Sequence, residues 1–587
     1  MSLNPKQQLV ADAKTYALTC ALPGSGKTHT SMELVKNLLE PKENKAVMVT
    51  FTRAGAGEMR ERVEKKLTAE QHKRVRVSTF HSLFISMYKA AGGYKKIIMG
   101  ADQDNIIRMA IKSVDAALLD DYMDVVQSID LLGRQLDPDM GAVPALHAEV
   151  FRKYQNLCRK YNKTDLNALS REVVLKLQNN EMKPLNCTHM IVDEFQDSDE
   201  VQVEFLLLLG RAGVIVMTVG DDDQSIYSFR GAMGYTGMVK FLDEFKIKAF
   251  VLDTCYRCAE EVLMSAKGLV ENNVYRVAKT MKSAAGDGGS VYVYETNDLE
   301  HEVEAIIKHI PSQKGQWAVL SRNQIQLDAV QTALEEHGFS YRRLGEKSIF
   351  ENKDVNALMT MMASIKYDKN KHNIIDTLMF MEEPEDNMDI IVNTLVTKKQ
   401  SLAHIAQSEF LDCSSELMNL SRLWPDLKYD TTNPSEIDRR CRELKNVIFR
   451  AKGVTADKGG KMFEAFFKMF TRWANKGGWT DAVEKTAYLL NNKDDSEKKE
   501  VEVELSTLHS SKGLEWPNVW IMGVNDSTIP GENINEATLE EERRLLYVGM
   551  TRAEKNLRLS YHKEKASCFI GELTHECIKF KRAAPSK

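Results

Sequence analysis

The chain has 587 residues, several times the size of an ordinary domain, so we expect roughly two to four folding units. Hydrophobic residues make up 43% and charged residues 28%, a composition typical of globular proteins. The longest apolar stretches, such as Phe205 to Leu209, are far shorter than a bilayer crossing, and no signal-peptide core is present. Nine scattered cysteines indicate a reducing compartment. We therefore expect a cytoplasmic protein with no membrane partner.

The net charge of −5 excludes a protein that coats nucleic acid by bulk electrostatic attraction. Composition alone therefore argues weakly against a DNA-binding function. Any binding of nucleic acid must come from a local groove, and the sequence motifs have to supply the argument for it.

Short apolar runs alternate with helical patterns in the first part of the chain. The runs expected to form strands are residues 16–20, 46–50, 75–78, 190–193, 214–220 and 250–253. Alternation of strands with helices predicts a parallel sheet with crossover helices. From about residue 83 to residue 180 the pattern changes to helices with polar faces and no strand, as in an insertion.

A second series of apolar runs follows. Its expected strands are residues 291–294, 317–321, 501–507 and 519–522. A helical region from about residue 358 to residue 495 interrupts it, and the charged stretch Asn491–Glu500 is typical of a solvated linker. The predicted fold class is therefore α/β, with two lobes built on parallel sheets, each interrupted by a mainly helical insertion. We expect the basic tail, residues 579–587, to be disordered.

The segment Ala21–Thr28 follows the first strand run and opens a helix, the context of a phosphate-binding Walker A loop. The loop residues that would cradle phosphates are Gly24, Ser25 and Gly26. Lys27 would reach the β- and γ-phosphates of ATP, and the Thr28 hydroxyl would ligate Mg²⁺. Because Ala21 stands where the strict pattern has glycine, an ordinary strand–turn–helix remains the alternative.

Two adjacent carboxylates end another expected strand, in the segment Ile191–Asp197. Neighbouring residues of a strand point to opposite sides of it, so the two acids can take different roles. Asp193 can hold Mg²⁺, while Glu194 would face the γ-phosphate and orient or deprotonate the attacking water. The alternative is an acidic strand end at the surface, which the preceding Walker loop argues against.

These segments belong to an ordered series, in which the chain resembles the superfamily-1 helicases of the UvrD/Rep/PcrA type. The similar segments are Leu3–Gln7, Val49–Met59, Ser78–Ser82, Asp193–Asp197, Val219–Ala232, Leu252–Arg257, Thr507–Trp516 and Glu541–Ala553. With the Walker loop, they correspond in order to the family's Q motif, its early DNA-contacting motifs and motifs II to VI.

The resemblance implies two RecA-like P-loop NTPase lobes. The implied boundaries are residues 1–85 and 181–255 for the first lobe, 86–180 for its insertion, 256–357 and 499–587 for the second lobe, and 358–498 for the second insertion.

Hydrolysis of ATP needs positive charge at the γ-phosphate, and an arginine supplied from a second body accelerates it by roughly 10³–10⁵. The resemblance assigns this role to Arg257 and Arg552, reaching across the cleft between the lobes. Gln224 would sense the γ-phosphate and couple it to neighbouring DNA-contacting residues. The implied catalytic residues are Lys27, Glu194, Gln224, Arg257 and Arg552.

The resemblance also implies contacts to the nucleoside. Gln7 would hydrogen-bond the adenine edge, Tyr256 would stack on adenine, and Glu515 would lie on the ribose side. His29 stands where the family commonly has an arginine near the base, which predicts looser nucleotide selectivity.

Single strands are held by aromatic stacking on unpaired bases together with phosphate contacts. The residues that the resemblance implies for DNA are Phe51, Thr79, His81, Tyr227, Phe229 and Arg230. Burial in the core is the alternative for any one aromatic residue, and Phe51 has the strongest case for it. Phe229 stands where the family usually has tryptophan, which keeps a stacking face of smaller area.

The implied function is an ATP-dependent helicase that moves 3′ to 5′ on single-stranded DNA and unwinds the duplex, with ATP and Mg²⁺ as cofactors. Its implied partners are single strands and single-strand/duplex junctions, together with unidentified replication or repair proteins. The second insertion lacks the Gly-Ile-Gly segment that relatives use against duplex DNA. The alternative is therefore a translocase that displaces bound proteins and unwinds weakly.

One further pattern stands apart from this function. Cys255 and Cys258 have the spacing of half a zinc site. No second cysteine pair at metal spacing occurs in the sequence, so we do not expect a metal here.

Overall fold

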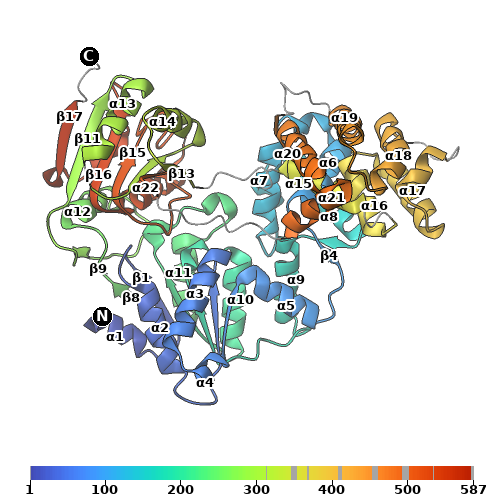
Figure 1. The fold of residues 1–587 in the computed structure, drawn as a ribbon. Helices are drawn as coiled ribbons and strands as arrows, with labels where there is room; N and C mark the ends of the chain where they lie inside the picture. Colours follow the sequence, from blue (N-terminus) through green and yellow to red (C-terminus); the bar gives the residue numbers. More distant parts are fainter. Residues whose placement is uncertain are drawn as a thin grey trace.

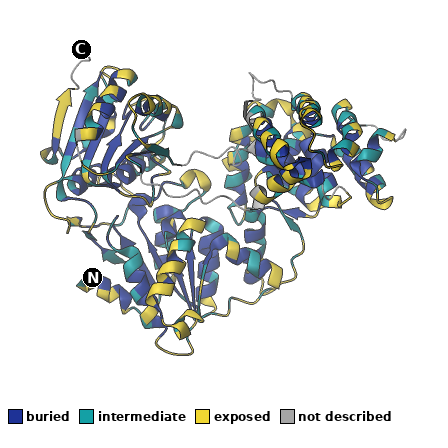
Figure 2. Ribbon diagram, viewed as in Figure 1, coloured by how far each residue is buried: buried dark blue, intermediate teal, exposed yellow. Residues whose placement is uncertain are grey.

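A computed structural model of the chain describes residues 2–312, 314–344, 353–365, 369–407, 413–452, 461–491, 501–532 and 534–582. Figure 1 shows two lobes that contain sheets and a helical body beside them. Most strands are buried between helices, whose outer faces carry many of the exposed residues, while one edge strand of the second lobe is itself exposed (Figure 2). In these ranges no helix is long and apolar enough to cross a membrane. The predicted α/β fold class, with two parallel-sheet lobes, is confirmed.

The first lobe is built on a six-stranded sheet in the order β3-β2-β6-β7-β1-β8, and every pairing in it is parallel. Its strands are β1 (Ala17–Ala21), β2 (Ala46–Thr50), β3 (Val75–Thr79), β6 (His189–Val192), β7 (Ile215–Gly220) and β8 (Phe250–Leu252). Its helices are α1 (Pro5–Ala11), α2 (Lys27–Leu38), α3 (Arg53–Lys66), α4 (Ala69–His72), α5 (Phe80–Ala90), α9 (Leu166–Gln178), α10 (Glu200–Arg211) and α11 (Gly234–Phe245). All six strands lie on predicted apolar runs.

Register determines which loops meet at one edge of this sheet. Cys20 lies opposite Gly220, and Val49 lies opposite Val192. Because the strands are parallel, the segments that follow β1, β6 and β7 leave the sheet at the same edge. This brings the expected phosphate loop and the expected acidic pair together.

The second lobe has a seven-stranded parallel sheet in the order β13-β14-β12-β15-β16-β11-β17. Its strands are β11 (Ser290–Thr296), β12 (Trp317–Ser321), β13 (Tyr341–Arg343), β14 (Val503–Thr507), β15 (Trp516–Ile521), β16 (Ala553–His562) and β17 (Ile578–Arg582). Its helices are α12 (Glu260–Val270), α13 (Leu299–His309), α14 (Gln324–Glu336), α22 (Glu536–Met550) and α23 (Cys568–Glu572). The short parallel pair β9 (Thr254–Cys255) and β10 (Lys282–Ser283) lies near the lobe junction.

Several strands were not predicted. The expectation of a disordered tail is wrong for its beginning, because β17 pairs with β11 at the sheet edge, while residues 583–587 lie outside the described ranges. Charged residues alternate along β17, which protects an edge strand from pairing with other chains and also hides it from a search for apolar runs. The first insertion also contains a short parallel pair, β4 (Lys96–Ile97) and β5 (Lys163–Thr164), where no strand was expected.

The helical body combines helices from both insertions. They are α6 (Ala101–Val114), α7 (Tyr122–Gly133), α8 (Ala145–Lys160), α15 (Lys353–Ser364), α16 (Lys371–Phe380), α17 (Glu385–Thr397), α18 (Ser415–Lys428), α19 (Pro434–Ala451), α20 (Lys461–Gly477) and α21 (Trp479–Asn491). One hydrophobic core runs through them, and α15 packs against both α6 and α21. The expected boundary at residue 357 falls inside α15, and α9 packs on α5 in the core of the first lobe.

A buried ion cluster joins the two insertions at this shared core. The ammonium of Lys163 is fully buried and lies 3.0 Å from the carboxylate of Asp376, on α16. Lys96 approaches the other oxygen of Asp376 at 2.6 Å. A charge buried in this way is tolerated only while its partner is present.

We expect Asp376→Ala to lower the free energy of unfolding of the helical body by about 3–5 kcal/mol, because it leaves the Lys163 ammonium buried without a carboxylate. Urea denaturation followed by circular dichroism measures the change. The matched control is Asp389→Ala, which removes a surface partner of Lys160 and should cost about 0–1 kcal/mol. Equal losses in the two variants would contradict the expectation.

Candidate nucleotide site and aromatic groove between the lobes

The phosphate loop runs from the end of β1 to the start of α2. Gly24 and Gly26 have φ values of +65° and +76°, a conformation that favours glycine. A Cβ atom on Gly24 would lie 2.4 Å from Arg257 Cβ, and one on Gly26 would lie 2.8 Å from Gln7 Nε2. Gln7 Nε2 also donates to the backbone carbonyl of Ser25 at 3.0 Å. The loop therefore depends on glycine for its shape and on α1 for its support.

Tyr256 lies beside this loop. Its backbone N–H donates to the carbonyl of Gly24 at 2.8 Å, and its hydroxyl accepts from Asn4 Nδ2 at 2.8 Å. The ring is 44% exposed, so it presents an accessible aromatic face between α1 and the loop. Gln7 and Tyr256, both predicted to contact the nucleoside, therefore lie beside the same phosphate loop.

Three polar atoms at this place have no hydrogen-bond partner among the described residues. They are Ser25 Oγ, His29 Nε2 and Arg257 Nε, all buried. Buried polar groups are normally satisfied, so an unpaired set beside a phosphate loop fits a polar ligand that is bound there.

The acidic pair follows β6. Glu194 has a φ of +54°, a strained conformation for a residue other than glycine, and its carboxylate accepts from Gln196 Nε2 at 2.6 Å. Burial, and then the neighbouring Glu194, raise the pKa of Asp193. Although burial would raise it, the pKa of Glu194 is lowered, because the ammonium groups of Lys27 and Lys512 lie close. The pair therefore holds one firmly ionised carboxylate beside Lys27.

Two arginines enter from the far side of this site. Arg552, just after α22, is buried, and its Nη2 donates to Gln224 Oε1 at 3.1 Å. Burial, and then the neighbouring Arg257, lower the pKa of Arg552 to about 10, so it stays charged at neutral pH. Arg257 pairs with Glu515 at 2.5 Å. The second lobe thus offers guanidinium groups to the site that the first lobe builds.

Gln224 is linked to both sides of the seam. It lies in the 3₁₀ turn η4 (Asp222–Gln224), and its Nε2 donates to Asp221 Oδ2 at 2.6 Å. Its side-chain oxygen accepts from Arg552, as described above. A movement of Arg552 would therefore act on the loop after β7 directly, through the Gln224 side chain.

Lys512 was not among the predicted site residues, yet it bridges the lobes. Its ammonium donates to both carboxylate oxygens of Asp197 at 2.7 Å and to the carbonyl of Gln224 at 2.8 Å. Gln196, also missed, is fully buried and connects the Glu194 carboxylate with the Asp221 N–H at 2.9 Å. Both residues stand inside the motifs quoted above, but their partners are distant in sequence.

An aromatic cluster extends from the nucleotide site along the seam. Phe51 and Tyr227 stack at 6.1 Å between ring centroids, and Phe229 lies edge-on to Tyr227 at 6.1 Å. His509 of the second lobe, which was not predicted, lies 5.8 Å from Phe229. Tyr227 and Phe229 form what we call the aromatic tip. The Arg230 guanidinium lies over both of these rings, 5.9 Å from the Tyr227 centroid and 5.6 Å from the Phe229 centroid. Phe51 is half-buried and faces other rings, so the alternative of a fully buried core residue is wrong.

Thr79 and His81 occupy the start of α5. Thr79 is buried, and its hydroxyl accepts from the Ser82 N–H and so caps the helix. His81 lies beside Arg134 and Asp130 of the first insertion, and burial, then Arg134, lower its pKa to about 4. At neutral pH His81 is therefore an uncharged donor and acceptor on the insertion side of the lobe.

A contact at the seam joins the aromatic tip to α22. The Ser228 N–H donates to the carboxylate of Glu541 at 2.8 Å, and the Ser228 hydroxyl donates to the same carboxylate. Ser228 stands between Tyr227 and Phe229, and Glu541 lies near the start of the helix that leads to Arg552. One helix therefore touches the aromatic tip and carries the residue that contacts Gln224.

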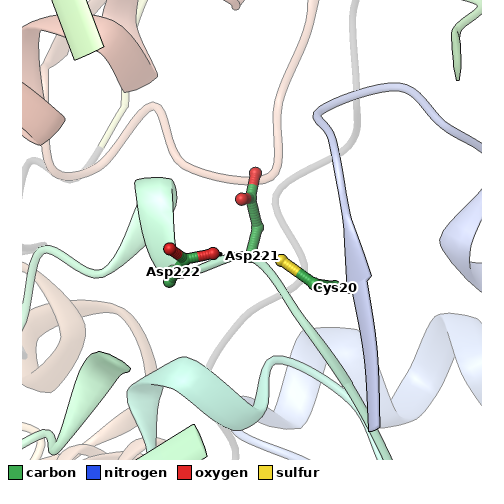
Figure 3. Close-up of side chains that lie close together, drawn as sticks. All are labelled: Cys20, Asp221 and Asp222. Carbon is green, nitrogen blue, oxygen red and sulfur yellow. Dashed lines mark hydrogen bonds between the residues drawn. The ribbon is translucent and has the colours of Figure 1, made fainter. Parts of the chain in front are cut away.

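Cys20, within β1, lies close to Asp221 and Asp222, which follow β7 (Figure 3), and the ligand atoms of the three residues lie close enough together for a metal ion. The ammonium of the fully buried Lys279 already lies 2.8 Å from Asp221 and 2.5 Å from Asp222, with Asp223 at 2.9 Å. Although burial would lower it, these carboxylates raise the pKa of Lys279. The cluster is an internal ion pair that fixes the turn carrying Gln224.

The pattern of the UvrD/REP helicase N-terminal domain matches residues 3–246, and that of the UvrD-like helicase C-terminal domain matches residues 250–419 and 461–564. The chain is similar to DNA helicase II of Haemophilus influenzae, 27% identical over 98% of this chain and 87% of the relative. It is also similar to ATP-dependent DNA helicase Rep of Escherichia coli, 27% identical over 98% and 92% of the two chains. For ATP-dependent DNA helicase PcrA of Leuconostoc citreum the values are 25%, 98% and 85%.

We expect Lys279→Met to lower the stability of the first lobe by about 3–5 kcal/mol, because Asp221 and Asp222 lose the ammonium that they share in a buried setting. The control is Lys282→Met, at an exposed position three residues away, which should change stability by no more than about 0.5 kcal/mol. Urea denaturation measures both. A Lys279→Met protein as stable as the wild type would show that this ion pair does not hold the turn.

Proposed function

Since the chain belongs to the UvrD/REP helicase family, and is therefore a DNA helicase of that type, we propose that it moves 3′ to 5′ along single-stranded DNA and separates the duplex, driven by ATP hydrolysis at the seam between its lobes. The observation that carries the proposal is the contact of Arg552, from the second lobe, with Gln224 in the first. It unites the phosphate loop, the acidic pair and the arginines around one site.

In the proposed nucleotide site, the phosphate loop of Gly24, Ser25 and Gly26 surrounds the phosphates, and Lys27 binds the β- and γ-phosphates. Thr28 and Asp193 would hold Mg²⁺, which supplies neutralisation of phosphate charge when it is bound. The unpaired atoms Ser25 Oγ, His29 Nε2 and Arg257 Nε support a polar ligand here. Gln7, Tyr256 and Glu515 surround the nucleoside side.

Glu194 orients and deprotonates the attacking water in this proposal. Its lowered pKa keeps it ionised, and the amide of Gln196 fixes its direction. Arg257 and Arg552 stabilise the negative charge that develops on the transferred phosphoryl group. Because they belong to the second lobe, turnover requires the lobes to be closed.

Coupling to DNA follows from the short distance between Gln224 and the aromatic tip. Tyr227 and Phe229 lie three and five residues after Gln224, and Phe51 and His509 complete the cluster. Stacking on unpaired bases contributes about 1–3 kcal/mol per base and tolerates any sequence, which suits a motor. Arg230 adds a cation for the phosphate backbone, and Thr79 and His81 would contact the strand on the insertion side.

A second function is a translocase that displaces bound proteins and unwinds weakly. The observation in its favour is the missing Gly-Ile-Gly segment of the second insertion. Unwinding of a 3′-tailed duplex, measured beside displacement of streptavidin from a biotinylated single strand, separates the two functions. Junctions are substrates in the first case, and replication or repair proteins are partners in either.

We expect Lys27→Ala and Glu194→Gln each to reduce DNA-stimulated phosphate release at least about 100-fold while single-strand binding persists, because both residues act on the phosphoryl group. Phosphate release is measured with single-stranded DNA, duplex DNA, RNA and no nucleic acid. Lys14→Ala, at an exposed position of the first lobe, is the matched control. Turnover that survives in either variant would refute the proposed division of roles.

We expect Glu541→Ala to raise about tenfold the concentration of single-stranded DNA that half-saturates ATP turnover. The turn that carries Phe229 loses the hydrogen bonds from Ser228 to the charged Glu541 carboxylate, and a hydrogen bond to a charged group is worth about 1.5 kcal/mol. The maximal turnover should change by less than about twofold, since Arg552 keeps its contact with Gln224. Glu536→Ala, exposed at the start of the same helix, is the control. A fall in maximal turnover at unchanged half-saturation would instead place Glu541 with the hydrolysis residues.

A further inference from the structure

The cysteine pair that the sequence analysis set apart lies at the nucleotide site. Cys255 ends β9, Cys258 precedes α12, and the turn between them carries Tyr256 and Arg257. Both cysteines are buried, and the Cys258 N–H donates to Cys255 Sγ at 3.3 Å. Their side chains therefore already face one another across a tight turn.

Each sulfur contacts a different side of the site. A Cβ atom on Gly24 would lie 3.2 Å from Cys255 Sγ, so this sulfur borders the phosphate loop. Cys258 Sγ donates to the carbonyl of Thr551 at 3.5 Å, and Arg257 Nη1 reaches the same carbonyl at 3.5 Å. The pair thus connects the phosphate loop with the residue that precedes Arg552.

The two thiols differ in acidity. The adjoining Cys258 side chain, followed by backbone N–H groups and the charge of Arg257, lowers the pKa of Cys255 to about 6 against the effect of burial. The adjoining Cys255 side chain, and then burial, raise the pKa of Cys258. One member is thus a thiolate near neutral pH and the other keeps its proton, the division that thiol–disulfide chemistry requires.

We propose that Cys255 and Cys258 form an oxidation site, at which a peroxide joins them in a disulfide and so stops turnover at the adjoining nucleotide site. The thiolate sulfur of Cys255 attacks one oxygen of the peroxide, the O–O bond breaks, and a sulfenic acid and hydroxide form. The thiol of Cys258 then attacks the sulfenic sulfur, which releases water. Overall, two thiols lose two electrons to one peroxide, and a dithiol reductant reverses the reaction.

The effect on turnover follows from the new bond and rests on the proposed function. A disulfide brings its sulfur atoms to about 2.05 Å, closer than any hydrogen-bonded thiol pair. Cys258 must then leave the carbonyl of Thr551, and the turn that holds Arg257 and Tyr256 tightens around the new link. Arg257 moves relative to the phosphate loop, against which its Cβ lies so close that a Cβ on residue 24 would be only 2.4 Å away.

The test uses the full chain treated with hydrogen peroxide, then blocked with N-ethylmaleimide, digested and analysed by mass spectrometry. We expect the peptide that contains both cysteines to lose two hydrogen masses and to resist blocking. DNA-stimulated phosphate release should fall at least tenfold and return after dithiothreitol. Cys258→Ser removes the resolving thiol, so after the same treatment its peptide should show no loss of two hydrogen masses, and a loss of two hydrogen masses in this variant would overturn the proposed pairing.

The control is Cys568→Ser, which removes an exposed thiol and should leave the oxidation response unchanged. The absence of the disulfide under conditions that fully oxidise Cys568 would overturn the proposal. So would a disulfide that forms without loss of turnover. Because the mass measurement needs no activity, a protein that forms the disulfide but never hydrolyses ATP would refute the proposed function and leave the oxidation site standing.

Discussion

The contact between Arg552 and Gln224 is the interaction on which the rest of the arrangement depends. A buried guanidinium from the second lobe donates to a side chain that the first lobe holds through Asp221. Lys512 adds a second link, from the same lobe to Asp197 and to the Gln224 carbonyl. These contacts require both lobes, so the site is complete only where the two bodies meet. A ligand that contacts residues of both lobes at this seam would therefore also favour the closed arrangement.

The turn that carries Gln224 is held by charge rather than by apolar packing. Asp221, Asp222 and Asp223 surround Lys279, and Arg276 pairs with Asp223 from the other side. Such an ion cluster gains little net stability over a hydrophobic one, yet it fixes a geometry. Here that geometry aims Gln224 at Arg552 and begins the segment that ends in the aromatic tip. In the proposed mechanism, this rigid turn would transmit a contact at the phosphate loop to the aromatic cluster.

Much of the fold, and the glycine loop between a strand and a helix, could be predicted from the sequence because these features are local. Strands buried on both faces are continuous apolar runs, and a glycine loop between a strand and a helix has few other uses. β17 was missed because its alternating charges suit an edge strand. The shared core of the two insertions was missed for another reason: the helices that meet there, α6 and α15, lie far apart in sequence.

The site residues that the sequence did not predict were also missed because their partners lie far away in sequence. Lys512, His509 and Glu541 act through partners in the other lobe, and no pattern within a short window reveals such a pairing. Gln196 was missed although it lies two residues from Glu194, because its role depends on the Asp221 N–H, which only the sheet register brings near. Sequence motifs thus indicate candidate residues, while the pairings that join these residues require the folded chain.

The net charge of the chain also indicates that the site depends on both lobes. A chain with a net charge of −5 can bind phosphates only where its cations are gathered and its carboxylates are occupied. At the seam, Lys27, Arg257, Arg552 and Lys512 converge from two lobes, while Asp197 and Asp221 are engaged by Lys512 and Lys279. Glu194 is the carboxylate there whose lowered pKa keeps it ionised beside Lys27. The positive field is therefore a property of the closed interface, and neither lobe alone would supply it.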